Sequence, residues 1–480
     1  MRFLRAKPAK RHSSPDENCA RPDSASFRDR SGRVYHRDGR IYRTVMLQAA
    51  DDFEFVRGTG LIDRLVQAKQ LVAENHANVD LVGGAAAGAR YVLEHPKLPF
   101  ISYPYEWSFG ALKSAALLQL DVHLEALEHG VTLSDASAYN VQFQGASPVF
   151  IDGLSFRRYV DGEYWSGHRQ FCDQFLNPLL LQSILGVPHN AWYRGSLDGI
   201  SAEHLNDLLP WHSKLSWGVF TNVVMQARLQ SRTRNDDSAL RRAEARKLPL
   251  TGLKELLRGM RRWISRLRPK GVRTTDWQGY ADNNSYQAEE SAAKRQFVAE
   301  FVREVSPDML WDMGCNTGDY SMVALESGAG RVVGFDFDHN AVDAAYQRSA
   351  ATDAKFLPLV LDAVNPSPGQ GWAQSERKGL DERGSADALV ALALVHHLAI
   401  GKNVPLTDVV NWLVQLAPVG IIEFVQKSDP MVQQLLRLRE DIFEDYNQQT
   451  FEAALERHAS ITKSEQVSAT GRRLYCYRRA

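Results

Sequence analysis

Cysteine is scarce in this chain, and no long apolar run is present. The 480 residues include four cysteines, which are scattered and have neither disulfide nor metal-ligand spacing: Cys19, Cys172, Cys315 and Cys476. No stretch is long and apolar enough to span a membrane, and the basic, polar N-terminus lacks the apolar segment of a secretory signal. We therefore expect a cytoplasmic protein of a reducing compartment, without a resident metal ion.

An excess of charge of one sign is also lacking. Lysine and arginine together number 57, as do aspartate and glutamate, so the formal net charge is zero. This balance removes any global electrostatic attraction to nucleic acid. Apolar residues make up 44% of the chain and charged residues 24%, proportions that are typical of a soluble globular protein.

The length predicts more than one domain, because 480 residues exceed the size of a single hydrophobic core. Residues 1–26 are rich in Arg, Lys, Ser, Pro and Asp, so we expect a disordered basic tail. Residues 27–230 contain many apolar runs, which predicts a first folded domain. A basic helical linker, 231–275, then precedes a second domain, 276–480.

The most informative feature is a glycine turn in the second half of the chain. An apolar, strand-like run leads into Asp312, and the turn that follows carries Gly314 and Gly318. A helix-like run, 320–325, comes next, and a second apolar run ends at Asp336. Strand, glycine turn, helix, strand and acid form one half of a nucleotide-binding α/β fold. The glycines let a ligand approach the backbone, and the second acid can hold a ribose.

The residues around this turn distinguish between nucleotides. A dinucleotide site has the pattern G-x-G-x-x-G, with a helix N-terminus directed at the pyrophosphate. This chain has D-x-G-x-N-x-G, with Asn316 at the place of a middle glycine; asparagine tolerates the left-handed backbone of a tight turn. An acid before the first glycine is unfavourable for pyrophosphate and suits the cationic end of S-adenosylmethionine (SAM). The segment resembles motif I of class I SAM-dependent methyltransferases.

Further polar residues follow predicted strands downstream. The apolar run 356–361 ends at Asp362, an acid suited to the adenine amino group. The run 387–395 is apolar on both faces, as in a buried parallel strand, and ends at His396 and His397. These side chains all lie at carboxyl ends of strands, where open α/β sheets bind their ligands.

The resemblance to the methyltransferase family covers roughly residues 280–480, including a further strand, 419–425, that contains Glu423. It implies an α/β, Rossmann-like class I methyltransferase domain with SAM as cofactor. The residues expected to bind that cofactor are Asp312, Gly314, Asn316, Gly318, Asp336 and Asp362.

The expected mechanism follows from this cofactor. The sulfonium methyl is already activated, so the protein chiefly holds it in line with a nucleophile. A hydroxyl acceptor needs a general base, for which His396 and His397 are the candidates, whereas an amine acceptor needs only positioning. Each histidine is equally compatible with a structural, hydrogen-bonded role. The motifs specify methyl transfer and leave the methyl acceptor open.

The first predicted domain carries a different pattern. Asp135 stands five positions before Asn140, and Asp152 follows an apolar run and precedes Gly153. Protein kinases use this order: a catalytic-loop aspartate, a metal-binding asparagine and a second metal-binding aspartate. A long predicted helix, 111–129, precedes these residues, and nearer the N-terminus Asp38-Gly39 is typical of a hairpin turn. The region resembles an α+β kinase-like domain, with 103–107 as its hinge.

Departures from the kinase pattern leave two hypotheses open. Leu133 and Ser134 replace the histidine and arginine that precede the catalytic aspartate, and no lysine occupies a clear third strand to pair with nucleotide phosphates. The domain is either a phosphotransferase that uses Asp135, Asn140 and Asp152, or an inactive kinase-like module that binds a substrate or partner. The missing lysine favours the second hypothesis.

Both domains together are similar to one bacterial family. The segments 104–109, 135–140 and 150–156, followed by the methyltransferase motifs, resemble class I SAM-dependent methyltransferases with a long N-terminal extension, some of them labelled nodulation-related. This resemblance implies methyl transfer without specifying the acceptor.

The linker contains a basic amphipathic helix. Between residues 240 and 267, leucines and other apolar residues recur at helical spacing with many arginines among them. Such a helix suits RNA or an anionic membrane surface, and equally a connecting helix packed on its neighbour, which we favour. Nothing else in the chain indicates a nucleic-acid or membrane partner.

Overall fold

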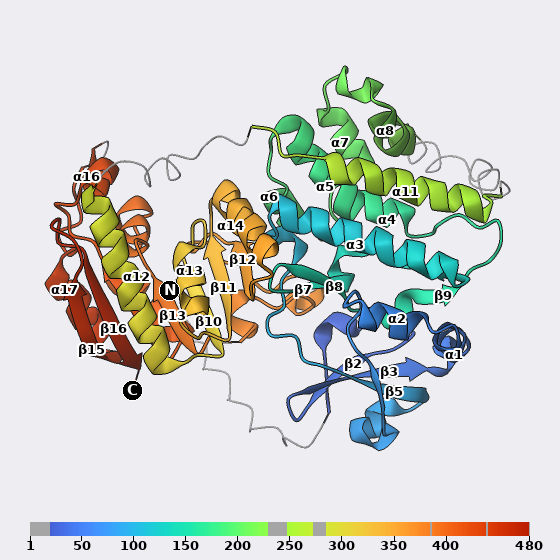
Figure 1. The fold of residues 1–480 in the computed structure, drawn as a ribbon, viewed down its shortest axis with the longest axis horizontal. Coiled ribbons are helices and arrows are strands. Elements are labelled where there is room, and N and C mark those ends of the chain that lie inside the picture. The colour runs from blue at the N-terminus through green and yellow to red at the C-terminus, as the bar shows by residue number, and fades with distance from the viewer. Residues whose placement is uncertain (1–19, 229–246, 272–284, 385, 438–439, 480) are drawn as a thin grey trace, which may run out of the picture.

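The computed structural model describes residues 20–228, 247–271, 285–384, 386–437 and 440–479, and the tail expected to be disordered lies outside them up to residue 19. Its two halves have separate sheets, coloured blue to green and yellow to red in Figure 1. No helix among these residues is long and apolar enough to cross a membrane.

The N-terminal sheet is antiparallel, with its five strands in the order β1-β2-β3-β5-β4. The strands are β1 (Arg21–Pro22), β2 (Val34–Arg37), β3 (Arg40–Met46), β4 (Asn75–Ala77) and β5 (Ala89–His95). Helices α1 (Ala50–Gly58) and α2 (Leu61–Gln67) connect β3 to β4. The predicted hairpin turn is confirmed, because Asp38 and Gly39 have φ values of 50° and 73° between β2 and β3.

The predicted tail is too long by its last seven residues. Residues 20–26 form β1 and the short helix η1 (Ser24–Ser26), so disorder is not found there. Asp23 explains this difference: its carboxylate caps η1 by accepting the Ala25 amide and also lies 2.6 Å from His36. These contacts attach the segment to the sheet.

A helical body follows the first sheet and is built around α3 (Phe109–Glu128). Ser108 caps α3 by accepting the Ala111 amide, and the helix ends before Gly130, whose φ is 68°. The predicted helix at 111–129 is therefore confirmed. The surrounding helices are α4 (His168–Phe171), α5 (Asn177–Leu180), α6 (Asn190–Gly195), α7 (Ala202–Leu208), α8 (Trp217–Val219) and α11 (Leu250–Arg266).

Helix α11 is the described part of the predicted basic helix, and it packs on α3 (Figure 1). Its apolar stripe is buried, and its basic face reaches carboxylates of α3 through pairs such as Lys254–Glu128 and Arg261–Asp121. The helix starts after Pro249, which is a favourable first-turn residue. The interpretation as a packed connecting helix is confirmed for these residues, while 240–246 lie outside the described ranges.

Two short antiparallel sheets follow α3 in the chain. The first pairs β6 (Val131–Leu133) with β9 (Phe156–Arg158), and the second is a hairpin of β7 (Val141–Gln144) and β8 (Ser147–Phe150). Their loops carry the residues of the kinase-like pattern.

The C-terminal sheet has seven strands in the order β12-β11-β10-β13-β14-β16-β15. All neighbouring pairs from β12 to β14 are parallel, whereas β16 runs antiparallel to both β14 and β15. The strands are β10 (Met309–Met313), β11 (Arg331–Asp336), β12 (Phe356–Val360), β13 (Ala388–Ala391), β14 (Val419–Phe424), β15 (Ala459–Gln466) and β16 (Arg473–Arg479). This is an open, Rossmann-like sheet that reverses its order beside β10, with the strand order of class I methyltransferases.

The α-helices beside this sheet, among the described residues, are α12 (Ser285–Val305), α13 (Asp319–Glu326), α14 (His339–Thr352), α15 (Leu406–Leu416), α16 (Pro430–Leu436) and α17 (Gln448–Glu456). The strands predicted around Asp312, Asp336, Asp362 and Glu423 are confirmed. The strand predicted over 387–395 was too long, because the observed strand, β13, ends at Ala391. Ala393 has a φ of 50°, which a strand does not allow.

The two halves share a continuous core. One hydrophobic cluster contains Trp107 and Phe100 of the first half together with Trp311 and Phe335 of the second. At the start of α3, the Gly110 amide donates to Asp343 of α14 at 2.6 Å. A Cβ on Gly110 would lie 2.3 Å from the end of the Gln347 side chain, so a larger residue there would displace that side chain.

Candidate functional site

The first element of the site is Asp312, one residue before the end of β10. Its side chain is buried and accepts a hydrogen bond of 2.6 Å from the Ser321 hydroxyl of α13. Burial raises the pKa of Asp312 to about 7, because no cation compensates its charge. The Asp312 carboxylate is thus buried between β10 and α13, the strand and helix that the glycine turn connects.

The turn itself has an unusual backbone. Gly314, Asn316 and Gly318 have φ values of 83°, 49° and 82°, so asparagine adopts the left-handed conformation expected of it. A Cβ on Gly318 would lie 2.4 Å from the Phe356 ring, which excludes any other residue there. The Gly314 and Cys315 amides donate to the Phe335 carbonyl at 2.8 and 3.1 Å, which ties the turn to the end of β11.

Asp336 closes the site at the end of β11. Its carboxylate accepts the Asn316 amide and the Asp338 amide, both at 2.9 Å. Burial raises the pKa of Asp336, while these backbone donors oppose that shift. The structure therefore brings the glycine turn and Asp336 into direct contact.

Asp362 lies two residues beyond the end of β12, which is the parallel neighbour of β11. It is exposed and accepts the Val364 amide at 3.1 Å. It shares with Asp312 and Asp336 the edge of the sheet at which the parallel strands end.

The two histidines follow β13 at the same edge. Their ring centroids are 4.2 Å apart; His396 is buried and His397 half-buried. Burial lowers the pKa of both rings, so both are neutral at physiological pH. Within the described part of the chain, Nδ1 of His396 has no hydrogen-bond partner. Both ring nitrogens of the buried His189 share this property, so the unpaired nitrogen does not by itself distinguish a catalytic from a structural histidine.

A buried ion network lies beside these histidines, centred on Glu423 of β14. Its side chain is fully buried and accepts the Ala393 amide at 2.8 Å, which fixes the loop leading to the histidines. Lys294 of α12 lies 2.8 Å and Arg472 3.7 Å from the same carboxylate. Both cations also pair with Glu290, at 2.7 and 3.5 Å.

Arg472 completes the network by binding Asp429 through two hydrogen bonds of 2.8 and 3.1 Å. Asp429, Arg472 and Lys294 all contribute to the electrostatic field at His396. Sequence reasoning identified Glu423 as an acid inside an apolar strand and missed its partners. The acid itself indicated that such partners exist, because a carboxylate in a strand that is apolar on both faces requires a cation nearby.

In the N-terminal half, the structure also brings together the predicted Asp135, Asn140 and Asp152. The Asn140 amide hydrogen-bonds Asp135 and lies 3.4 Å from the Ser155 hydroxyl, which donates to Asp152. Burial and the charge of Asp152 together raise the pKa of Asp135. The three residues form one polar cluster in the loops of the two short sheets, β6–β9 and β7–β8.

Arg43 is the residue of this cluster that the sequence did not reveal. It lies on β3, is buried, and places its guanidinium 2.5 Å from Asp152 and 2.7 Å from Asp29. A buried arginine therefore pairs with Asp152, one of the two residues that would bind a metal ion under the alternative phosphotransferase hypothesis. Its position on β3 gives the cluster a cation where the sequence showed no lysine.

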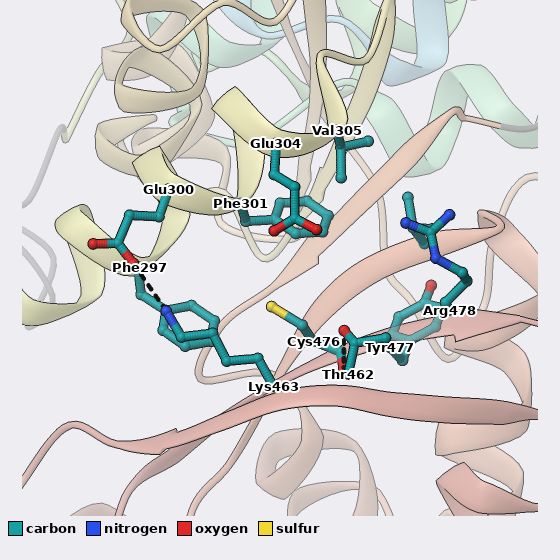
Figure 2. A pocket seen from close by; sticks show the side chains of 11 residues that line it. Phe297, Glu300, Phe301, Glu304, Val305, Thr462, Lys463, Cys476, Tyr477 and Arg478 are labelled. Atoms are coloured by element: carbon teal, nitrogen blue, oxygen red, sulfur yellow. Dashed lines mark hydrogen bonds and ion pairs between the residues drawn. The ribbon is translucent and has the colours of Figure 1, made fainter.

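A separate cavity of about 270 Å³ lies between α12 and the β15–β16 hairpin (Figure 2). It reaches Val419, the first residue of β14, and so lies at the opposite end of the strands from Asp312. Its buried Cys476 has a pKa raised to about 12 by burial, which makes the thiol a poor nucleophile. None of the predicted site residues lines this cavity.

The fold and the cluster at its strand ends define a Rossmann-like α/β protein with the strand order of class I methyltransferases. No family model matches the chain. The chain is 47% identical over 435 residues to nodulation protein NoeA of Rhizobium meliloti (strain 1021), covering 90% of this chain and 91% of that protein. The chain therefore belongs to the NoeA family.

Solved structures of two methyltransferases are also similar to part of the chain. Magnesium protoporphyrin IX methyltransferase (ChlM) from Synechocystis PCC 6803, with bound SAH, has 16% identity and a TM-score of 0.30 over 42% of this chain and 89% of its own. N-methyltransferase NodS from Bradyrhizobium japonicum WM9, in complex with S-adenosyl-l-homocysteine, has 12% identity and a TM-score of 0.31 over 43% of this chain and 93% of its own.

Proposed function

We propose that the C-terminal half is a SAM-dependent methyltransferase. The observation that carries this proposal is the contact between the glycine turn and Asp336, in which the Asn316 amide donates to the carboxylate. Three left-handed residues in five positions leave a backbone that a ligand can approach closely. The relative from R. meliloti is named a nodulation protein, and we extend that role to this chain.

The residues at the strand ends fit this cofactor. Asp336 would hold the ribose hydroxyls, and Asp362, exposed beyond β12, would meet the adenine amino group. Gly314 and Asn316 would supply backbone next to the amino-acid end, with Asp312 behind them favouring its positive charge. When bound, SAM supplies an activated methyl group; the protein supplies position and proton acceptors.

The acceptor would approach from the side of the histidines. Glu423 holds the Ala393 amide and so fixes the loop that carries them. Both rings are neutral and can accept a proton, and His397, the more accessible one, can pass it on to solvent. We assign His397 as the first candidate base for a hydroxyl acceptor and His396 as the ring packed beneath it.

The test is methyl transfer by the full chain from methyl-labelled SAM to fractionated small molecules of the host bacterium. We expect label in one acceptor fraction with the wild-type protein, and less label in that fraction with Asp336→Asn at SAM concentrations below saturation. A wild-type protein that binds SAM but labels no fraction would contradict the enzymatic role. The acceptor fraction, once found, decides between an amine and a hydroxyl, because only a hydroxyl requires the base.

We further propose that residues 27–230 form a kinase-like module for substrate or partner binding. The alternative, a phosphotransferase, is favoured by one observation: Asp135, Asn140 and Asp152 lie in one cluster. The ion pair between Arg43 and Asp152 argues against it, because a metal ion would have to displace a buried guanidinium. A thermal-shift assay with ATP and magnesium separates the two: stabilisation that Asp152→Asn abolishes would support the phosphotransferase.

A further inference from the structure

Four large apolar side chains project from a short segment between α7 and α8. Leu208 is 48% exposed, Trp211 75%, Leu215 74% and Trp217 79%. We name these four residues the tryptophan ridge. Single exposed apolar residues are ordinary on protein surfaces, but four within ten positions, two of them tryptophan, mark an interaction site.

The ridge is a built feature of the fold. Successive i to i+3 hydrogen bonds run through it, from the Ser213, Lys214 and Leu215 amides to the Pro210, Trp211 and His212 carbonyls, at 3.1 to 3.3 Å. Beneath the ridge, Leu205, Leu209, Val219 and Val223 belong to the main hydrophobic core. Buried residues at these neighbouring positions hold the backbone in place, so the ridge side chains are directed outward by the fold itself.

The ridge segment carries a positive charge and no negative one. Lys214 lies within it, and no aspartate or glutamate occurs between residues 208 and 228; the nearest acid along the chain is the exposed Asp207, which precedes Leu208. Helix α11 lies beside α8 (Figure 1), with Trp263 so near Gly218 that a Cβ there would lie 2.8 Å from its ring. Arg262 and Arg266 flank Trp263 and are exposed.

We propose that the tryptophan ridge binds the surface of an anionic lipid bilayer. Tryptophan favours the boundary between water and acyl chains, where its ring is buried and its N–H stays near the head groups. Leucines on the same segment can enter the acyl region, and the neighbouring cations attract anionic head groups. This binding differs from the membrane contact that the sequence suggested for the basic amphipathic helix. That helix, α11, buries its apolar stripe on α3, so the stripe is not available to a bilayer.

A second copy of the chain is a less suitable occupant. Pairing two ridges would bring Lys214 and the arginines of α11 close to the same residues of the other copy, and these like charges repel. Nucleic acid would match the cations and leave the two leucines in contact with a charged backbone. An anionic bilayer matches both the apolar and the basic residues.

Co-sedimentation of the full chain with extruded vesicles tests the proposal. One set of vesicles contains phosphatidylcholine alone, and the other also contains phosphatidylglycerol. We expect sedimentation with the second set, weakened by salt, and a blue shift of tryptophan fluorescence. Trp211→Ser with Trp217→Ser should reduce binding tenfold or more, because both indole rings are removed from the bilayer contact.

The matched control is Trp372→Ser, which removes a tryptophan that is 70% exposed in the other half of the chain. It should bind vesicles as the wild type does. Circular dichroism checks that the variants are folded, which is expected because they change exposed side chains. The proposal is overturned if the wild type does not bind anionic vesicles, or if the double variant binds them equally well. Self-association without lipid that the double variant abolishes would instead assign the ridge to a second copy.

Discussion

Glu106 and Arg383 form a bidentate ion pair at the junction of the two halves, with distances of 2.6 and 2.7 Å and both side chains 1% exposed. The guanidinium also lies over the Phe100 and Tyr103 rings and donates to the Ile101 carbonyl. Arg383 belongs to the long connection between β12 and β13, which begins at Asp362. The pair therefore anchors the segment beside the proposed adenine site to the N-terminal half.

The same connection reaches the kinase-like cluster. The Arg377 guanidinium lies 4.1 Å from the ring of Tyr139, which stands between Asp135 and Asn140. Arg194 of α6 donates to the Asn365 and Pro366 carbonyls at 2.8 and 2.9 Å. One segment of the C-terminal half is thus in contact with both the hinge and the loop of the proposed kinase-like module.

Removing the cation of the buried pair should destabilise the protein strongly. Arg383→Met leaves Glu106 charged and unpaired in the core, and we expect a loss of about 3–5 kcal/mol in the free energy of unfolding, measured by denaturant titration. Adding Glu106→Gln to Arg383→Met should recover part of the lost free energy of unfolding, because the unpaired buried charge is then removed. Arg28→Met removes an arginine that is 66% exposed and pairs with Glu376, and it should have little effect. A loss equal to that of Arg28→Met would contradict the buried pairing.

Asp312 should make stability depend on pH. Its pKa is about 7 in the folded protein and 3.8 in a model compound, so the folded state binds the extra proton between these values. Stability from this group is therefore present at low pH and is lost as pH rises from about 4 to 7. Melting temperatures of the wild type and Asp312→Asn are compared across this pH range. The variant should lack the part of the loss of stability that is due to Asp312. A parallel decline in both proteins would show that Asp312 is not the group responsible.

Glu423 should matter for stability and for the histidine loop. Glu423→Gln keeps an acceptor for the Ala393 amide but removes the buried carboxylate between Lys294 and Arg472, which then share only Glu290. We expect a destabilisation of about 1–3 kcal/mol in denaturant titration, because a buried charged hydrogen-bond partner is lost. The control, Glu300→Gln, removes an exposed carboxylate that pairs with Lys463, and its unfolding midpoint should not move. Equal midpoints for the two variants would exclude the network as a structural element.

Substitutions in the two halves should separate their roles. Asp312→Ala removes the acceptor for the Ser321 hydroxyl next to the glycine turn and should abolish methyl transfer. Asp135→Ala should leave it largely intact, because Asp135 lies in the other half of the chain. The assay is transfer of labelled methyl to the identified acceptor fraction. The reverse pattern would make the N-terminal half the enzyme.

Local patterns made the parallel strands of the C-terminal sheet and one hairpin of the first sheet predictable. Apolar runs gave β10, β11, β12 and β14 close to their observed bounds, and Asp38-Gly39 specified its hairpin, because both signals act over a few residues. The end of β13 was misplaced, since the left-handed backbone of Ala393 is held by Glu423, thirty residues away. Such long-range contacts leave no periodic signal.

The ion pairs were beyond prediction for the same reason. Lys294 and Arg472 come from segments far before and far after Glu423, and only the order of strands brings them together. Arg43 and Asp152 meet across two different sheets. The order of residues 20–26 likewise depends on contacts with residues further along the chain, such as the pairing of β1 with β2 and the contact between Asp23 and His36.

The central claim is SAM binding at the glycine turn, and calorimetric titration of the full chain with S-adenosylhomocysteine and SAM tests it most directly. We predict one saturable site, weakened by about 1–3 kcal/mol in Asp336→Asn, because the ribose would lose a charged hydrogen-bond acceptor. Asp308→Asn is the control, since Asp308 is exposed and precedes β10 at the opposite end of the strand; its affinity should equal that of the wild type. Absence of binding by folded wild-type protein at millimolar ligand would contradict the account.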